Sequence, residues 1–180
     1  MARITSAIGL DIGHRSLKLV RMTRRVTGPA VIFADMLMLP EGGQGLEPIV
    51  HRFLESHGVL HERCGVCVSG RSVMVHVSDV PFADRKARQQ FAQLEARRMN
   101  ELAQDEIVSA YAIRGREVGA DGVMVAMAQA EAVREALQVP DTIGLHVVRL
   151  IPAPVAVYRG VLAPATVKES VWLLADVGHT

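Results

Sequence analysis

The chain has 180 residues, 49% of them hydrophobic and only 4% aromatic, so it can bury an aliphatic core in one domain or two small ones. Its 20 basic and 19 acidic residues give a net charge of +1, too little to hold a nucleic-acid backbone, and we expect no nucleic-acid partner. The N-terminus lacks the pattern of a signal peptide, and no apolar run approaches the ~20 residues of a membrane span. The sequence therefore predicts a cytoplasmic protein.

Alternating apolar positions and Gly turns in the first part of the chain predict strands, with Leu17 and Leu19 on one face. A helical spacing of apolar residues, ended by Gly58, follows a loop rich in Pro and Gly. The expected elements are strands at 6–13, 16–25 and 30–39, a helix at 46–58, and a buried strand at 64–70. This order indicates an α/β layer with a mixed sheet.

The middle of the chain has a different character, with a long polar helix between strands. Asp84 can cap this helix, and Phe91, Leu94 and Leu102 are expected near one of its faces. The expected elements are a strand at 72–81, the helix at 85–102, a hairpin of 107–118 and 122–130, and a helix at 131–139. This β-α-β-β-α order predicts a small inserted α+β subdomain at residues 73–147.

The last part returns to the pattern of the first. It predicts a strand at 145–152, a helix at 153–163 with Pro154 in its first turn, and a strand at 170–178. The core domain is therefore expected to consist of residues 1–72 and 148–180.

Two short stretches share the order Asp, aliphatic residue, Gly and His, each after an apolar run: Asp11-Ile12-Gly13-His14 and Asp176-Val177-Gly178-His179. Each alone fits an ordinary hairpin turn, in which Gly supplies backbone freedom and Asp bonds local amides. As a pair they also fit a phosphate site. The N–H groups of a tight turn converge on anions, and Lys18 on the next strand can add a point charge. The two Asp residues would then hold a hydrated Mg²⁺.

The first stretch with Lys18, and a later strand that ends in Asp176-x-Gly178-x-Thr180, resembles the two phosphate loops of the actin-like ATPase superfamily. Within that superfamily, the chain is most similar to the type IV pilus assembly protein PilM family. The similar blocks, in order, are IGLDIGHRSLKLVRM, VMVHVSDVP, EARRMNELAQDEIVSAYAI, VMVAMAQAEAVREAL and VVRLIPAPVAVYRG. Together they cover most of the chain.

The resemblance implies a fold and a cellular role. The fold is an actin-like (ribonuclease H-like) ATPase lobe of class α/β, with the small α+β subdomain that this branch shares with the cell-division protein FtsA; the second lobe is expected to be absent from these 180 residues. The role is that of a cytoplasmic adaptor at the inner face of the inner membrane, peripheral to it through its partner, the N-terminal tail of the membrane protein PilN. Self-association is compatible with this role.

The resemblance also implies ATP and Mg²⁺ as ligands. The residues that match the cofactor-binding positions are Asp11, Gly13, His14, Arg15, Ser16, Lys18, Asp176, Gly178 and Thr180, with Asp11 and Asp176 holding the metal through water. His14, Arg15 and His179 depart from the family, which keeps small residues there. Two alternatives stay open: their bulk fills the place of the terminal phosphate, or a cationic His14 or Arg15 contacts it. Since the adenosine pocket of this superfamily follows later in the chain, we expect these 180 residues alone not to bind ATP tightly.

Three rival functions share the fold. A phosphotransferase (kinase) needs an acidic general base, but Asp79 and Asp84 are better explained as turn and cap residues. An ATP-binding scaffold is therefore favoured over a catalyst. An FtsA-like filament former and a secretion adaptor of the GspL type are separated poorly by one sequence, and both stay alternatives.

The two cysteines, Cys64 and Cys67, have the C-x-x-C spacing of zinc and redox sites, with His51, His57 and His61 upstream. They lie in an apolar run that reads as a buried strand, where positions three apart face opposite sides. We therefore expect core residues that neither bind metal nor form a redox pair.

Overall fold

The computed structural model describes residues 6–41, 45–70, 73–79, 84–101, 106–114 and 122–162. The elements in these ranges are β1 (Ser6–Ile12), β2 (Ser16–Arg25), β3 (Gly28–Met38), α1 (Leu46–Ser56), β4 (Arg63–Val68), β5 (Val73–Asp79), α2 (Arg85–Glu101), β6 (Ile107–Arg114), β7 (Gly122–Gln129), α3 (Ala130–Thr142), β8 (His146–Pro152) and α4 (Ala153–Leu162). None of the helices described is long and apolar enough to cross a membrane.

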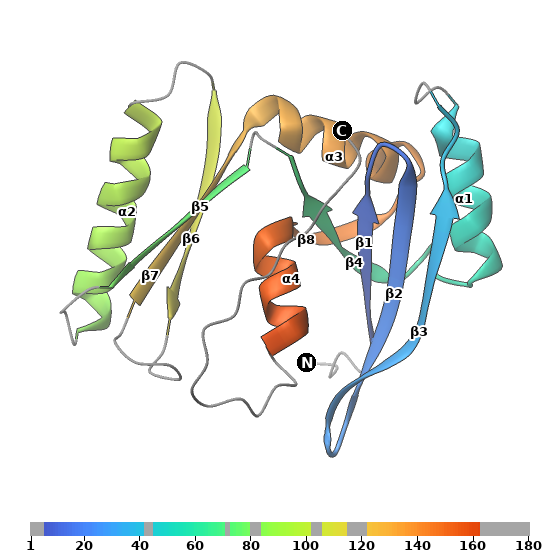
Figure 1. Ribbon diagram of the computed structural model, residues 1–180, viewed down its shortest axis with the longest axis horizontal. Coiled ribbons are helices and arrows are strands. Elements are labelled where there is room, and N and C mark those ends of the chain that lie inside the picture. Colours follow the sequence, from blue (N-terminus) through green and yellow to red (C-terminus); the bar gives the residue numbers. More distant parts are fainter. Residues whose placement is uncertain are drawn as a thin grey trace. The chain divides into compact units, whose positions relative to one another are not determined.

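The chain divides into two compact units (Figure 1). The first consists of Met1–Val68 and Glu135–Thr180, and the second of Ser69–Arg134. The boundary between them falls inside α3. The segment proposed from the sequence as a subdomain, 73–147, contains the elements of the second unit and runs on through α3 to the start of β8.

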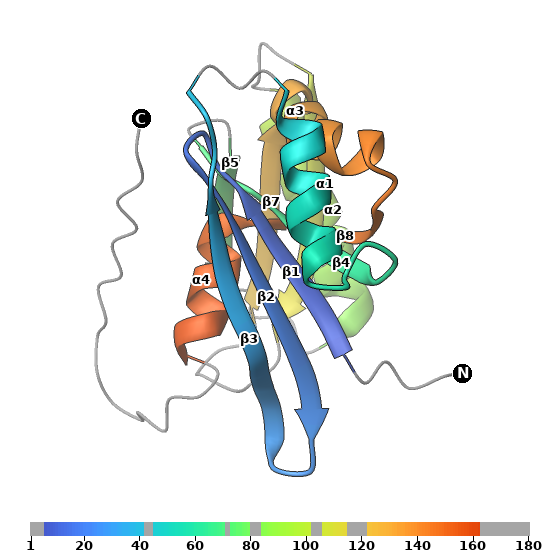
Figure 2. The ribbon, with the colours of Figure 1, turned by 90° about the vertical axis from the view of Figure 1, so that its right-hand side faces the viewer.

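The first unit is built on a five-stranded sheet in the order β3-β2-β1-β4-β8. The pairs β1–β2 and β2–β3 are antiparallel, whereas β1–β4 and β4–β8 are parallel, so the predicted mixed sheet is confirmed. Helices α1 and α3 cover one face of this sheet, and α4 lies on the other (Figure 2). Both faces of the central strands are therefore in contact with helices, as expected for an α/β layer.

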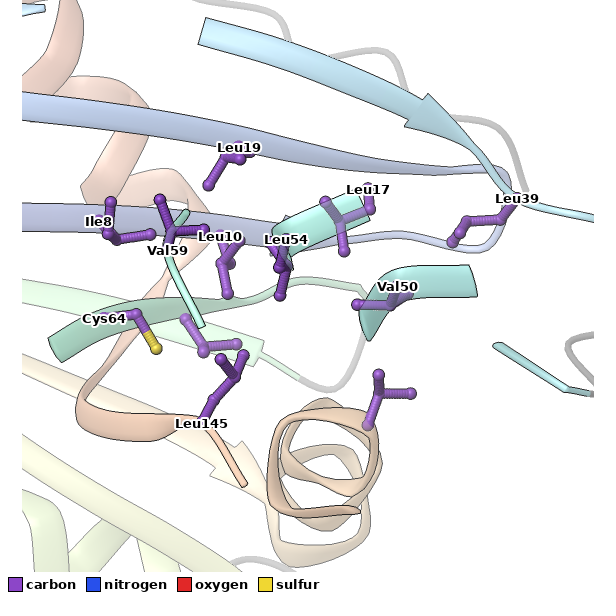
Figure 3. Close-up of a cluster of buried hydrophobic side chains, with 12 residues drawn as sticks. Ile8, Leu10, Leu17, Leu19, Leu39, Val50, Leu54, Val59, Cys64 and Leu145 are labelled. Atoms are coloured by element: carbon purple, nitrogen blue, oxygen red, sulfur yellow. The ribbon is translucent and has the colours of Figure 1, made fainter. Parts of the chain in front are cut away.

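The core of the first unit lies between the sheet and α1 with α3. Alternate residues of the central strands point into it, because successive side chains of a strand face opposite sides. Leu17 is 0% exposed and Leu19 is 1% exposed, as the alternation predicts, and Val50 and Leu54 of α1 are fully buried against them. Gly58 ends α1 in the left-handed region, with φ +65°, and its N–H donates to the Glu55 carbonyl. Figure 3 shows these side chains converging from strands and helix.

The second unit has a three-stranded antiparallel sheet in the order β5-β7-β6, with α2 packed on one face. Asp84 caps α2, since its Oδ2 accepts a hydrogen bond of 3.0 Å from the Ala87 N–H. Of the residues predicted near the buried face, Phe91 is confirmed, Leu94 is wrong and Leu102 lies outside the described residues. Leu94 is 62% exposed, whereas Ala92 and Ala96 are buried against Val125 and its neighbours, with Phe91 and Met99 partly buried beside them. The buried face therefore combines small and large side chains.

The hairpin partners β6 and β7 pair antiparallel as predicted, from Ile107 with Gln129 to Arg114 with Gly122. Helix α4 begins directly after β8, with Pro154 in its first turn, again as predicted. The strand expected at 170–178 lies outside the described residues.

Candidate phosphate-binding turn

The first Asp-x-Gly stretch forms the turn between β1 and β2, at one end of the strands of the five-stranded sheet. Asp11 is the penultimate residue of β1 and pairs across the ladder with Lys18 of β2. Because β1 and β4 run parallel, the C-terminal ends of both strands lie on this side of the sheet. Ligands of α/β sheets bind outside the carboxyl ends of parallel strands, so the turn occupies the position expected of a binding site.

Asp11 and Lys18 form an ion pair, with 3.0 Å between Lys18 Nζ and Asp11 Oδ2. Their side chains are 31% and 58% exposed, respectively. Exposed pairs of this kind contribute little to stability, about 0–1 kcal/mol. The ion pair therefore contributes little to the stability of the turn. Breaking it so that Asp11 and Lys18 contact a ligand would cost little free energy.

The backbone of the turn is held open by two hydrogen bonds. The Gly13 N–H donates to the Ser16 carbonyl at 2.9 Å, and the Leu39 N–H donates to the Arg15 carbonyl at 2.9 Å. Within the described residues, the N–H groups of His14 and Arg15 make no backbone hydrogen bond, and both residues are exposed. These two N–H groups are the ones that an anion could accept from.

Gly13 does not have the role that the simple hairpin reading gave it. Its φ lies outside the left-handed region, so no special backbone freedom is required at this position. A Cβ added there would lie 3.4 Å from the Ser16 carbonyl oxygen, at the short end of ordinary van der Waals contact. Neither the backbone conformation nor steric crowding therefore demands a glycine at this position.

Arg15 already has an anionic partner. Its Nη1 lies 2.7 Å from Glu41 Oε1, and the two side chains are 49% and 77% exposed. A phosphate that contacts Arg15 would compete with the Glu41 carboxylate for the guanidinium group. Glu41 was not singled out from the sequence, since it lies in a loop far along the chain from the turn.

Cys67 belongs to the same neighbourhood, which the sequence analysis also missed. Burial raises the pKa of the Cys67 thiol, the charge of Asp11 raises it further, and the ammonium group of Lys18 lowers it. Leu10 pairs with Val66 in the parallel β1–β4 ladder, so Asp11 and Cys67 stand at the next step of the same register. The pairing of β1 with β4 is what brings Cys67 close to Asp11, and a single sequence does not show which strands are neighbours.

The two cysteines face opposite sides of β4, as the alternation predicts. Cys64 is 2% exposed inside the core cluster, and its Sγ lies 3.8 Å from the His146 carbonyl oxygen. Both thiols are free, and burial raises the pKa of Cys64 as it does that of Cys67. Over the ranges that the structure describes, no group of three or more His, Cys, Asp or Glu side chains could hold a metal ion. His57 is engaged elsewhere, 3.0 Å from Asp35 Oδ2.

The second stretch, with Asp176, Gly178 and Thr180, lies outside the described residues, so its relation to the turn stays a prediction. The first stretch alone supplies one carboxylate, one ammonium group and two exposed backbone N–H groups. This set fits one phosphate with a hydrated Mg²⁺, a cation that keeps several waters and needs few protein ligands. It contains no group that would hold a base or a ribose.

The chain was compared with known proteins. No protein-family model and no curated protein matches it. Among solved structures, a chain of the PilM–PilN type IV pilus biogenesis complex matches with a TM-score of 0.65 and 26% identity, over 86% of this chain and 49% of that one. The present chain thus spans about half the length of that protein.

Two other solved structures match less well. The cytoplasmic domain of EpsL, an inner-membrane component of the type II secretion system of Vibrio cholerae, has a TM-score of 0.47 and 15% identity, over 82% of this chain and 57% of that one. A Bacteroides thetaiotaomicron protein with an actin-like ATPase fold has a TM-score of 0.42 and 7% identity, over 86% and 55%. The PilM–PilN match confirms the resemblance seen in the sequence: this chain has a mixed α/β fold and is similar in structure to a chain of the PilM–PilN type IV pilus biogenesis complex.

Proposed function

We propose that the protein is a PilM-like cytoplasmic component of a type IV pilus or a related secretion machine, held at the inner face of the inner membrane by the N-terminal tail of a PilN-like partner. The observation that carries the proposal is the similarity to a chain of the PilM–PilN complex, at 26% identity over 86% of this chain. The sequence blocks that resemble the PilM family also support the proposal, because they occur in the family's order and come from both compact units.

The second unit offers the surface that suits an extended tail. Since Val123, Val125 and Met127 point toward α2, the intervening residues of β7 and their partners face away from it. The residues of this open face are all apolar: Val73, Val75 and Val77 on β5, Met124, Ala126 and Ala128 on β7, and Val108, Ala110 and Ala112 on β6. Val77 and Val108 are 45% and 47% exposed.

The edge of the same sheet supplies the second element of recognition. β5 stands at the end of the strand order β5-β7-β6, so its outer backbone groups are not used by this sheet. Extended peptides gain affinity from main-chain hydrogen bonds to such edges and specificity from side-chain contacts. We therefore place the tail along β5, from Val73 to Asp79.

Calorimetry with a synthetic peptide tests this proposal, using the N-terminal tail of a PilN-like membrane protein. The substitution Val77→Glu puts a charge on the open apolar face and should weaken binding at least about tenfold, since a charge loses hydration there. The matched control is Val26→Glu, at a residue that is 107% exposed in the other unit. Equal affinities of the two variants for the peptide would refute the placement of the tail on β5. No binding of the peptide by the unaltered chain would refute the proposed function.

We also propose that the β1–β2 turn contacts a phosphate and Mg²⁺ of ATP, with Lys18 on the phosphate and Asp11 on a metal-bound water. The described part of the site is exposed, where salt screens phosphate contacts. These 180 residues should therefore bind Mg-ATP only at millimolar concentration, about −4 kcal/mol. Micromolar binding that Asp11→Ala abolishes would refute this and would mean that the two Asp-x-Gly stretches suffice.

A further inference from the structure

Arg15 combines two features of the β1–β2 turn that suit a phosphate. Its guanidinium group is 49% exposed, and Nη1 lies 2.7 Å from Glu41 Oε1. Its N–H is one of the two in the turn that make no backbone hydrogen bond within the described residues. A guanidinium group can bind a phosphate through two parallel hydrogen bonds, whereas an ammonium group such as that of Lys18 acts as a point charge. Arg15 is therefore the side chain of the turn whose geometry best fits a phosphate, once the Glu41 carboxylate has left it.

The position of Glu41 is set by the backbone of the segment after β3. Leu39 is only 6% exposed in the core of the first unit, and its N–H donates to the Arg15 carbonyl at 2.9 Å. Pro40 then fixes one backbone dihedral angle between this anchor and Glu41. A buried side chain and a main-chain hydrogen bond thus keep the Glu41 carboxylate near Arg15, although the Glu41 side chain is itself 77% exposed.

The contact between Arg15 and Glu41 is weak enough to exchange. An exposed ion pair shifts an equilibrium by at most about fivefold. A terminal phosphate group carries about 1.5 to 2 negative charges and three acceptor oxygens, against one charge on a carboxylate. A phosphate at the turn therefore competes successfully for the guanidinium group, and Glu41 makes that phosphate bind less tightly than Arg15 alone would allow.

We propose that Arg15 contacts a phosphate of the bound nucleotide and that Glu41 is an internal competitor for its guanidinium group, which lowers the affinity of the turn for phosphate. This inference rests on the proposed contact of the turn with ATP. It chooses between the two alternatives that the sequence left open for Arg15, a cationic contact and a bulk that fills the place of the terminal phosphate. The two alternatives predict opposite effects when the charged side chain is replaced by a shorter, neutral one.

NMR titration of the 180-residue chain with Mg-ATP measures affinities in the millimolar range expected for the turn. Glu41→Gln removes the competing carboxylate and should strengthen binding by about two- to fivefold, the range of an exposed ion pair. Arg15→Gln removes the cation and should weaken binding by a similar factor. Glu55→Gln is the matched control: it removes the same charge from an exposed position of α1 and should leave the affinity unchanged.

The double variant Arg15→Gln, Glu41→Gln separates competition for Arg15 from a general effect of charge. Without the guanidinium group, Glu41→Gln should change the affinity no more than the control does, because the two residues then no longer act on each other. An equal gain from Glu41→Gln with and without Arg15 would overturn the inference, as would an unchanged affinity in Glu41→Gln. Tighter binding by Arg15→Gln would also overturn it and would favour the alternative of bulk.

Lys18→Gln tests the proposed contact with ATP separately. If Mg-ATP binds neither the unaltered chain nor Glu41→Gln, that contact and the inference are both refuted. If Lys18→Gln weakens binding and Arg15→Gln does not, the contact stands and the inference alone fails. Because the side chains of Arg15 and Glu41 are exposed, neither substitution should disturb the fold, and the spectra of the free proteins check this.

Discussion

The two units build their cores from different side chains. In the first, Leu10, Leu17 and Leu54 are at most 2% exposed and meet between a five-stranded sheet and two helices. In the second, one helix buries Ala92 and Ala96 against a three-stranded sheet, with Phe91 and Met99 partly buried beside them. Since buried apolar area sets the hydrophobic stabilisation, we expect the first unit, which has the larger buried cluster, to be the more stable. Both units leave large apolar side chains exposed, such as Met36 and Met38 in the first and Val77 and Val108 in the second. In the second unit they lie on a sheet face next to the edge strand β5.

The largest expected effect is in the first core. Leu54→Ala removes a fully buried side chain and should lower the free energy of unfolding by about 2–5 kcal/mol, from lost burial and the cavity left behind. Urea unfolding measures this. Leu94→Ala is the control: because Leu94 is 62% exposed, the change should stay within about 0.5 kcal/mol. A larger loss at Leu94 than at Leu54 would reverse the comparison of the two units.

A smaller effect is expected in the second core. Val125 is 2% exposed, and Val125→Ala should destabilise its unit by about 2 kcal/mol. Native-state hydrogen exchange should show faster exchange in β5, β6 and β7, with little change in β1 and β2. Faster exchange of equal size in both units would show that they unfold as one, which would contradict their division.

The cap of α2 should matter less than its core. Asp84→Ala removes the hydrogen bond to the Ala87 N–H and should lower stability by about 1 kcal/mol. Asp84→Ser keeps a capping oxygen and should recover most of it. Thermal unfolding of the three proteins measures the difference; if Asp84→Ser is no better than Asp84→Ala, the cap hydrogen bond is not the cause.

The smallest effects concern the thiols near the turn. Because burial and Asp11 raise the pKa of Cys67, its thiolate is scarce at neutral pH, and its reaction with a thiol reagent should be slow and accelerate as pH rises. Asp11→Asn should lower that pKa and speed the reaction, and Lys18→Gln should raise it and slow the reaction. Cys64, inside the core, should react more slowly than Cys67 in every variant.

The unaltered protein also serves to test the zinc hypothesis for the cysteines. Elemental analysis should find no stoichiometric zinc, because the two thiols face opposite sides of β4. The expectation that both are core residues holds for Cys64, whereas Cys67 is only partly buried on the other face of β4. Zinc that is lost in a Cys64→Ala, Cys67→Ala variant would contradict the expectation that the two cysteines do not bind metal. If the Cys67 thiol reacts at the same rate in Asp11→Asn and in Lys18→Gln, these two charges do not affect its pKa, and Cys67 does not lie close to the turn.

The first unit was readable from the sequence because its signals are strong and local. The alternation at Leu17 and Leu19 has the period of a strand, and Gly58 stands where a left-handed residue ends α1. The helix of the second unit was harder. Its most buried residues, Ala92 and Ala96, carry little apolar signal, whereas the exposed Leu94 carries much.

The site was readable only in part, for a different reason. Asp11 and Lys18 are seven residues apart on one hairpin, so the sequence placed both at the same turn, but it did not predict that they pair with each other. Glu41 and Cys67 come to the same region through the loop after β3 and through the parallel β1–β4 ladder. Such contacts depend on which strands are neighbours, which composition and periodicity do not specify.

The central claim is that the second unit, and not the first, receives the partner's tail. Hydrogen exchange of the full chain, with and without the tail peptide at saturating concentration, tests it most directly. The account predicts slower exchange in residues 73–79, because new main-chain hydrogen bonds form along the edge of β5, and no change in β1 or β2. Protection confined to residues 1–40 would contradict it.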